Sequence, residues 1–317
     1  MRVARLHGIR DLRIEVVPLP EPGPGELLVR VEGCGICPTD VRKYLIGVND
    51  GDYPINPGHE WVGRVERAGP DAGEWWEGQR VYGDTYGGYA EFALLPATPG
   101  PWSYGPLELP EELPLERAVF VEPLADCLHA VRDQARVAEG DRLVVVGAGQ
   151  MGLQLVLAGA VAGADVLCVE PLGERRRLAL ALGAVEAVDP ADGAPDADAE
   201  AVILTIGAGS LVGPALAATR PGGRVVLFAG FGDDGIVAVD LNWVHYQEIT
   251  LIGSEWIGTP PNQRREHYAD ALALLESDRA PLEQLVSGRC GFEGIEAAFA
   301  AQREHRVLKG LLVPETR

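Results

Sequence analysis

The chain has 317 residues and a mass of 33.8 kDa, more than one hydrophobic core usually supports, so we expect two domains. Hydrophobic residues make up 47% and charged residues 23%, which is typical of globular proteins and excludes a disordered chain. The formal net charge of −20 argues against electrostatic binding of nucleic acid or an anionic membrane, and favours small-molecule partners. Five cysteines, with no basic-then-apolar leader, indicate a reducing cytoplasmic location.

The chain is β-rich up to about Leu95. Short apolar runs begin at Leu27, Trp61 and Tyr89, and Pro- and Gly-rich turns separate them. Residues 97–114 are dense in Pro and Gly, which indicates a surface connection, and residues 115–135 have a helical pattern. We therefore expect a compact β-rich unit that leads into a helix.

From Arg142 onward, strand-like apolar runs alternate with helical patterns, which predicts a parallel, doubly wound sheet and an α/β fold class. The predicted strands are 143–146, 166–170, 201–205, 224–228 and 249–253. The predicted helices are one from about Gln150, then 174–182, 211–218 and 265–276. Residues 143–164 carry no formal charge and are long enough to cross a bilayer. Their β-branched start and Gly-Ala-Gly break instead indicate a buried strand followed by a buried helix.

A G-x-G-x-x-G motif, Gly147, Gly149 and Gly152, directly follows the first of these strands. In a dinucleotide site the first glycine permits a tight turn, the second lets the backbone approach a pyrophosphate, and the third lets helix and strand pack closely. Gln150 and Met151 open the helix, whose N-terminal amides suit a phosphate. The sequence therefore predicts a dinucleotide-binding turn.

Glu170 ends the next strand, at the distance from Gly147 that a βαβ unit requires. A carboxylate there accepts both ribose hydroxyls of NAD and would face the 2′-phosphate of NADP, so NAD is favoured. Arg175 and the two arginines after it leave NADP open as the less favoured cofactor. The alternative is a glycine-rich turn in an ordinary α/β domain, with Glu170 merely exposed.

The β-rich unit contains candidate zinc ligands. Cys34 and Cys37 have C-x-x-C spacing, but no second pair exists to complete a four-cysteine structural site. The thiolate of Cys37, the imidazole of His59 and a carboxylate would suit a catalytic zinc, which keeps a fourth position for water or substrate. The alternative is that Cys37 belongs to the core and His59 to a turn.

Five blocks resemble, in order and over essentially the whole chain, the zinc-dependent medium-chain alcohol and polyol dehydrogenases, in their sorbitol and threonine dehydrogenase branch. These blocks are 33–40, 57–60, 121–124, 147–152 and 221–225. The resemblance implies a GroES-like catalytic domain at 1–123 with 257–317, and a Rossmann domain at 124–256. It also implies zinc-dependent hydride transfer to NAD from a secondary alcohol of a polyol, sugar, cyclitol or amino alcohol.

By this resemblance Cys37 and His59 are zinc ligands, and Glu60 and Glu122 stand at the two positions where relatives supply the third. Which of the two carboxylates binds the metal stays open. The cluster is expected to hold one catalytic zinc per chain.

The resemblance also assigns roles around the metal. Asp40 is expected to hold His59, and Thr39 to pass the substrate proton towards the nicotinamide ribose. Lys309 stands where relatives place a basic residue near the cofactor phosphates, with an ordinary surface lysine as the alternative. Arg42 replaces a histidine that ends the proton relay in many relatives, so the exit route of the proton stays open.

Relatives often carry a four-cysteine zinc lobe where this chain has only residues 82–86, so we expect that lobe to be absent. Candidate pocket residues are Tyr44, Thr85, Trp102 and Trp256. His129 is interpreted as a structural helix residue. Relatives pair through the edge strand of the nucleotide domain, which implies a homodimer or homotetramer through residues near 249–256.

Two other functions remain as alternatives. A zinc-free quinone or enoyl reductase of the same fold would have lost the metal ligands. A non-catalytic dinucleotide-binding protein would keep the glycine motif and Glu170 but lose the metal set. The presence of Cys37, His59 and both carboxylates argues against each of them.

Overall fold

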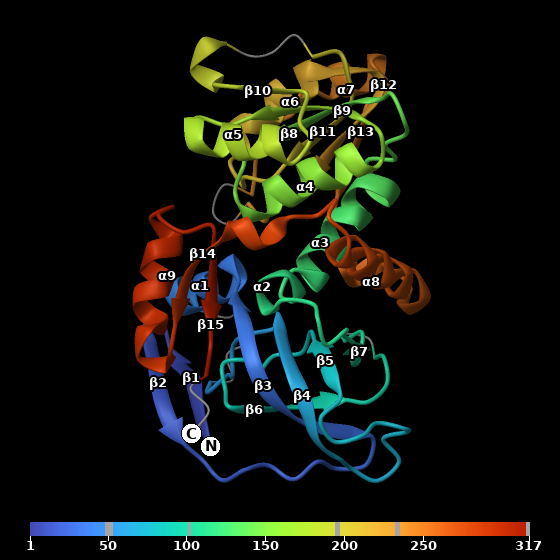
Figure 1. Cartoon of the computed structure of the whole chain (residues 1–317). Helices are drawn as coiled ribbons and strands as arrows, with labels where there is room; N and C mark the ends of the chain where they lie inside the picture. The colour runs from blue at the N-terminus through green and yellow to red at the C-terminus, as the bar shows by residue number, and fades with distance from the viewer. Residues whose placement is uncertain (48–52, 101–102, 194–196, 232–234, 315–317) are drawn as a thin grey trace. The chain divides into compact units, whose positions relative to one another are not determined.

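The computed structural model describes residues 1–47, 53–100, 103–193, 197–231 and 235–314. The chain forms two compact units, each with its own sheet (Figure 1). The first unit comprises residues 1–122 and 272–317, and the second comprises residues 123–271.

The second unit is larger than the domain predicted at 124–256. Residues 257–271, which we expected in the first domain, lie in the second unit. The reason is helix α8 (Pro261–Glu276), whose Tyr268 packs against Trp256 with ring centroids 6.2 Å apart.

The sheet of the first unit is built around one long strand, β3 (Glu26–Ile36). On one side β3 pairs antiparallel with β4 (Trp61–Ala68), and on the other with β15 (Lys309–Leu312) and β6 (Phe92–Pro96). The pairing of Gly310 with Ile36 brings the C-terminal strand beside the N-terminal sequence blocks. The fold thereby joins segments that are more than 270 residues apart.

Shorter elements complete the first unit. The remaining strands are β1 (Arg2–Gly8), β2 (Asp11–Val16), β5 (Arg80–Gly83), β7 (Leu107–Glu108) and β14 (Val286–Cys290). The helices are α1 (Pro38–Ile46), α2 (Leu115–Ala118) and α9 (Ile295–Arg303), and α3 (Val121–His129) begins at its edge. Helical turns lie at Leu282–Leu285 and Phe292–Gly294.

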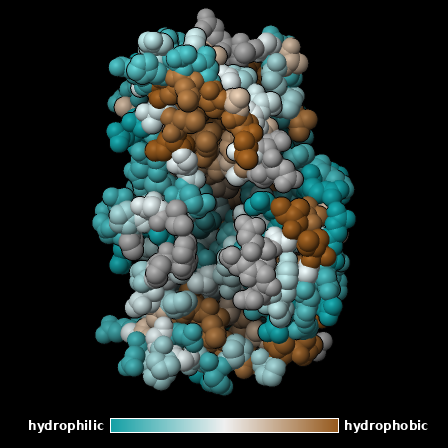
Figure 2. Space-filling model, turned by 180° about the vertical axis from the view of Figure 1, so that it is seen from behind, coloured by the Kyte–Doolittle hydropathy of each residue, from teal (hydrophilic) through white to brown (hydrophobic). Residues whose placement is uncertain are grey.

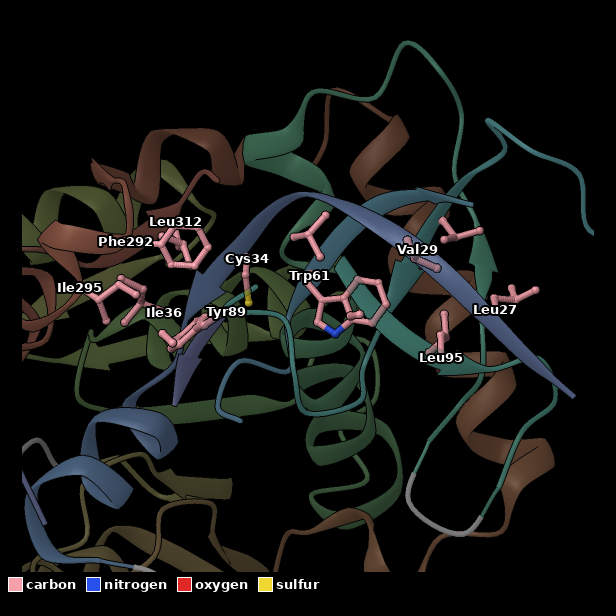
Figure 3. Close-up of a cluster of buried hydrophobic side chains, with 14 of the residues drawn as sticks. Leu27, Val29, Cys34, Ile36, Trp61, Tyr89, Leu95, Phe292, Ile295 and Leu312 are labelled. Atoms are coloured by element: carbon pink, nitrogen blue, oxygen red, sulfur yellow. The ribbon is translucent and has the colours of Figure 1, made fainter. Parts of the chain in front are cut away.

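The core of the first unit lies between its sheet and helix α9. Alternate residues of β3 point inward, and they meet Trp61, Tyr89 and Leu95 as well as Phe292 and Ile295 (Figure 3). Trp61 and Tyr89 are fully buried. Because these large rings lie directly beside the ends of β3 and β4, they fix the two chain segments that carry the candidate metal ligands.

The second unit contains a six-stranded parallel sheet in the order β10-β9-β8-β11-β12-β13, which is the Rossmann arrangement. Its strands are β8 (Arg142–Val146), β9 (Asp165–Val169), β10 (Glu186–Val188), β11 (Ala199–Leu204), β12 (Thr219–Leu227) and β13 (Thr250–Gly253). Its helices are a π-helical turn, η1 (Ala130–Gln134), then α4 (Gln150–Val161), α5 (Gly173–Ala181), α6 (Val212–Ala218), α7 (Leu241–Tyr246) and most of α8. Short 3₁₀ turns lie at Pro190–Asp192, Gly209–Leu211 and Trp256–Gly258.

The expected α/β class and parallel sheet are confirmed. The uncharged run 143–164 divides into β8 and α4, and among the described residues no helix has both the length and the apolar character needed to span a membrane. The sequence pattern did not predict the β1–β2 hairpin or strand β10. Strand β10 has three residues, too few for a periodic signal.

Candidate active site

The first unit brings together three side chains of the kinds that bind zinc: Cys37, His59 and Glu60. One ligand atom from each lies within 4.8 Å of the others. Cys37 immediately precedes α1, while His59 and Glu60 immediately precede β4, so the antiparallel pairing of β3 with β4 joins the two sequence blocks. Cys37 and His59 are partly exposed and Glu60 is buried. Cys37 and His59 therefore each have some surface in contact with solvent, whereas Glu60 has almost none.

Asp40 stands behind His59. Atom Nδ1 of His59 lies 3.4 Å from Oδ2 of Asp40, which also accepts a hydrogen bond of 3.2 Å from the hydroxyl of Tyr89. Burial raises the pKa of Asp40, but the neighbouring His59, the backbone N–H of Gly58 and the charge of Lys43 together outweigh it, so this pKa lies below its ordinary value. Burial acts to lower the pKa of His59, but Asp40 and Cys37 together raise this pKa well above its ordinary value. A carboxylate in this position orients the imidazole of a metal ligand.

Glu60 is bound by Lys309. Both side chains are buried, with 1% and 0% exposed, and the ammonium group donates to Oε2 of Glu60. Lys309 also lies 5.5 Å from the ring centroid of Phe120. A Cβ on Gly35 would lie 2.8 Å from Cε of Lys309, so the ion pair needs a glycine at that point of β3.

The alternative of an ordinary surface lysine at position 309 is wrong, because this side chain is buried and its ammonium pairs with Glu60, a carboxylate of the candidate metal cluster. A place near the cofactor phosphates stays a prediction. Sequence reasoning missed this pairing because Glu60 and Lys309 are 249 residues apart.

Glu122, in the first turn of α3, lies outside the group of described ligand atoms that meet within 4.8 Å. Burial raises its pKa to about 7, and the charges of His59, Glu60 and Lys309 also act on it. The carboxyl group of Glu122 therefore interacts with the charges of the same cluster. Glu60 is the carboxylate whose ligand atom lies within 4.8 Å of those of Cys37 and His59.

Two further residues border the cluster. The ring centroid of Tyr86 lies 5.1 Å from that of His59, and Nζ of Lys43 lies 3.7 Å from the ring centroid of Tyr86. Sequence reasoning did not select either residue. The available signal was the place of Tyr86 in the short connection that replaces the lobe of relatives. Thr39 and Arg42 of α1 are both exposed.

In the second unit the glycine motif forms the turn between β8 and α4. Gly147 has a φ of 99°, which favours glycine, and a Cβ on Gly152 would lie 2.9 Å from the carbonyl carbon of Gly147. Thr205, directly after β11, closes the turn from the side, because its hydroxyl donates to the carbonyl of Val146 at 2.7 Å. Thr205 was predicted only as the end of a strand.

The outer side of this turn has free space. Gly149 has a φ of −70°, and a Cβ built on it would meet nothing within 4 Å. Gln150, the first residue of α4, is 5% exposed, yet neither polar atom of its amide has a hydrogen-bond partner. Met151 follows it and is partly exposed. An open glycine and an unpartnered amide at a helix N-terminus fit an incoming phosphate.

Glu170 connects the turn to the end of β9. It is 4% exposed, and its two carboxylate oxygens accept hydrogen bonds from the backbone N–H of Ala148 at 2.7 Å and of Leu172 at 2.9 Å. The alternative in which Glu170 is merely exposed is therefore wrong. Each carboxylate oxygen has a second lone pair, so a ribose hydroxyl can still be accepted.

The arginines after Glu170 lie on α5. Arg176 donates to the carbonyl of Glu170 at 2.6 Å and to Asp189 at 2.9 Å, so its guanidinium is held by this loop. Arg175 is partly exposed in the first turn of the helix. The loop thus combines a buried carboxylate with cationic side chains.

The four predicted pocket residues have different surroundings. The hydroxyl of Tyr44 donates to a carboxylate of α9 at 2.6 Å. The hydroxyl of Thr85 is buried without a hydrogen-bond partner. Trp256 stacks on His129, with ring centroids 4.9 Å apart. Trp102 lies outside the described residues.

These residues fit both groups that the chemistry requires. The first unit offers a thiolate, an imidazole and a carboxylate, a donor set that suits catalytic zinc. The second offers a Rossmann turn with an open glycine and a carboxylate at the end of the next strand. Together they define the class of nicotinamide-dependent dehydrogenases that use zinc.

Comparison with known proteins agrees with this class. The family model of the alcohol dehydrogenase GroES-like domain matches residues 23–99, and that of zinc-binding dehydrogenases matches residues 147–277, together more than half of the chain. The chain belongs to the zinc-dependent medium-chain dehydrogenase family, in its sorbitol dehydrogenase-like branch. Membership implies zinc and a nicotinamide cofactor.

Curated relatives include polyol and diol dehydrogenases. The chain is 32% identical to (R,R)-butanediol dehydrogenase of Bacillus subtilis over 56% of its own length and 60% of that protein. It is 31% identical to human sorbitol dehydrogenase over 54% of its own length and 55% of that protein. The matched region thus spans little more than half the length of these relatives.

Solved structures share the fold over nearly the full length. A Sinorhizobium meliloti protein described as a zinc-binding dehydrogenase and bound to NADP has a TM-score of 0.87 and 25% identity, with 99% of each chain covered. The butanediol dehydrogenase of Bacillus subtilis has a TM-score of 0.85, again with 99% of each chain covered.

Proposed function

We propose that this protein is a zinc-dependent dehydrogenase that transfers a hydride to NAD from a secondary alcohol of a polyol, sugar, cyclitol or amino alcohol. The observation that carries the proposal is the convergence of Cys37, His59 and Glu60 within 4.8 Å, with Asp40 behind the imidazole. The named relatives that act on butanediol, erythritol or threitol, and sorbitol support the substrate class.

The metal would be held by Cys37, His59 and one of the two carboxylates, Glu60 or Glu122. Zinc lowers the pKa of a bound water from 15.7 to about 7, and the same Lewis acidity would make a bound alcohol acidic enough to give up its proton. Lys309 pairs with Glu60 and holds it in place beside the ligands. Its ammonium also competes with the metal for one oxygen of Glu60.

The chain supplies the route for the proton and the orientation of the ligands. Oδ2 of Asp40 lies 3.4 Å from Nδ1 of His59 and can orient the ring, which would leave the other ring nitrogen for the metal. Thr39 lies two residues beyond Cys37, exposed in the first turn of α1, where its hydroxyl can accept the substrate proton and pass it on. Arg42 is exposed on the same helix, so water can receive the proton directly.

We propose NAD rather than NADP as the cofactor. Both oxygens of Glu170 are held by backbone N–H groups, so the carboxylate is fixed at the position where it would receive ribose hydroxyls. A 2′-phosphate would meet this buried negative charge. The relative solved with NADP makes direct measurement necessary, with both dinucleotides titrated into the same protein.

The experiment that tests the metal site compares two cysteine variants. Cys37→Ser should remove zinc from the first unit and abolish activity, while binding of NADH in the second unit stays within about threefold of wild type, less than 0.7 kcal/mol. Cys290→Ser is the matched control, because this half-buried thiol on β14 lies outside the cluster. Loss of NADH binding in Cys37→Ser would show a structural role for Cys37.

The reaction itself is tested by screening secondary alcohols and polyols for NADH absorbance. Turnover that needs zinc supports the proposal. Reduction of quinones or enones without zinc would instead support the reductase of the same fold, and NADH binding without any turnover would support a non-catalytic protein.

We also propose self-association through the edge of the second sheet and a cytoplasmic location. Strand β13 is an edge strand, and Leu241, Tyr246 and Leu251 on and near it are 75%, 76% and 38% exposed. Figure 2 shows hydrophobic surface gathered on this unit. Leu251→Lys should shift the mass measured by light scattering to that of a monomer, whereas Leu180→Lys on α5 should not.

The free cysteines of the described residues suit the reducing compartment of the proposed cytoplasmic location.

A further inference from the structure

A second group of metal-binding side chains lies in the second unit: His129, Asp133 and His267. One ligand atom from each lies within 4.8 Å of the others. Nδ1 of His129 and Nε2 of His267 are both 2.7 Å from the same oxygen, Oδ2 of Asp133. Three donors therefore converge on one point that the proposed dehydrogenase reaction does not use.

The local backbone explains how the group forms. His129 is the last residue of α3, and Asp133 lies four residues later in the π-helical turn η1, so both side chains lie on one helix face. Such π-helical turns are frequent at functional sites. His267 comes from the first half of α8, 134 residues after Asp133. The contact joins two segments that local sequence pattern does not connect.

The surroundings close the group on one side and leave it open on the other. His129 and His267 are 2% and 6% exposed, and Trp256 stacks on the ring of His129. The side chain of Asp133 is 41% exposed. A set of two imidazoles and one carboxylate leaves a fourth coordination position, which a water molecule can enter from the open side.

The outer contacts of the group suit a metal-bound imidazole. Nε2 of His129 lies 3.0 Å from the side-chain amide of Gln134 and 3.3 Å from the hydroxyl of Thr259. The hydroxyl of Thr259 can accept the N–H of a metal-bound imidazole, which is the usual support for such a ligand, whereas the amide nitrogen of Gln134 can only donate.

We propose that His129, Asp133 and His267 form a second metal site, which binds Zn²⁺ or a similar divalent ion of intermediate softness. Nitrogen and oxygen donors in this combination select zinc, cobalt or nickel over magnesium or calcium. The ion would join α3 and η1 to α8 and so stabilise the second unit. This proposal does not depend on the proposed dehydrogenase reaction. It adds one ion to the single zinc that the sequence predicts.

The test uses the full chain with Cys37→Ser, so that the first unit no longer competes for metal. Zinc titrated calorimetrically into the chelator-treated protein should bind at one equivalent per chain. Adding His267→Asn, or separately Asp133→Asn, should weaken this binding at least ~100-fold, because second-sphere changes alone cost ~10–100-fold. His245→Asn is the matched control, since this exposed histidine of α7 lies outside the group, and it should change nothing.

A second measurement covers the case in which a variant fails to fold. Cobalt added to chelator-treated wild-type protein should bind at two equivalents, and the thiolate-to-cobalt charge-transfer band should account for only one of them. A single equivalent in wild type, no binding to the Cys37→Ser protein, or unchanged affinity in a folded His267→Asn protein would overturn the proposal. In that case the three side chains form a hydrogen-bonded group without metal.

Discussion

Replacement of two glycines of the same turn by alanine should separate packing from cofactor binding. A Cβ on Gly152 would lie 2.9 Å from the carbonyl carbon of Gly147 and closer still to its oxygen. Carbon atoms pack at about 3.5–4.0 Å, so the turn between β8 and α4 must move by about 0.6 Å or more. A Cβ on Gly149 would meet nothing within 4 Å, and its φ of −70° is open to any residue.

The expected magnitudes follow from these contacts. For Gly152→Ala, overpacking against backbone costs about 3 kcal/mol or more, and the better helix propensity of alanine returns about 1 kcal/mol. The net loss of about 2 kcal/mol corresponds to about 4–8 °C in Tm for a domain of this size. Gly149→Ala should leave stability unchanged or raise it by up to about 1 kcal/mol, because the unfolded chain loses freedom.

In cofactor binding the order should reverse, and Gly149→Ala, the variant that keeps its stability, should lose affinity for NADH. The methyl group of Gly149→Ala occupies the space through which a pyrophosphate approaches the turn, so NADH affinity should fall at least tenfold, about 1.4 kcal/mol. Thermal unfolding without cofactor and fluorescence titration with NADH measure the two effects. Wild-type NADH affinity in Gly149→Ala, or a wild-type Tm in Gly152→Ala, would refute this reasoning.

Three further predictions concern charged side chains. In metal-free protein, Lys309→Met leaves the buried carboxylate of Glu60 without its partner and should lower the free energy of unfolding in urea by about 3–5 kcal/mol; an unchanged midpoint would contradict the pairing. Glu170→Gln should weaken NAD more than NADP in fluorescence titrations, and equal losses would exclude a ribose contact. Arg117 lowers the pKa of Glu283, so their pair stabilises the fold above the unfolded pKa of Glu283 and loses its effect as pH falls through the folded pKa. Arg117→Met should therefore destabilise the protein more at pH 7 than at pH 3, as followed by chemical unfolding at both values.

Elements with strong local signals could be predicted from the sequence. The apolar block before Gly147 and the helix after it appear within one or two residues of the expected bounds, because a buried parallel strand needs an uninterrupted apolar run. Helix α8 begins at Pro261, four residues before the predicted start. Proline is favoured in the first helical turn, and that signal was available.

Strand β3 shows where local pattern fails. The apolar run that begins at Leu27 ends before Gly33, but the strand continues to Ile36. Both glycines are needed for close contacts: a Cβ on Gly33 would lie 2.8 Å from the side chain of Leu115. A glycine inside a strand has this meaning only when the neighbouring element is known.

The sequence by itself determined which chemical groups are available and their order: the thiol, imidazole and carboxylate blocks, and the glycine turn followed by Glu170. Residue types at short spacing carry this information directly. Only the tertiary structure decided that Lys309 pairs with Glu60 and that His267 meets His129 and Asp133. These partners are more than 130 residues apart in the chain, and their contacts depend on which strands and helices pack together, which no local pattern specifies.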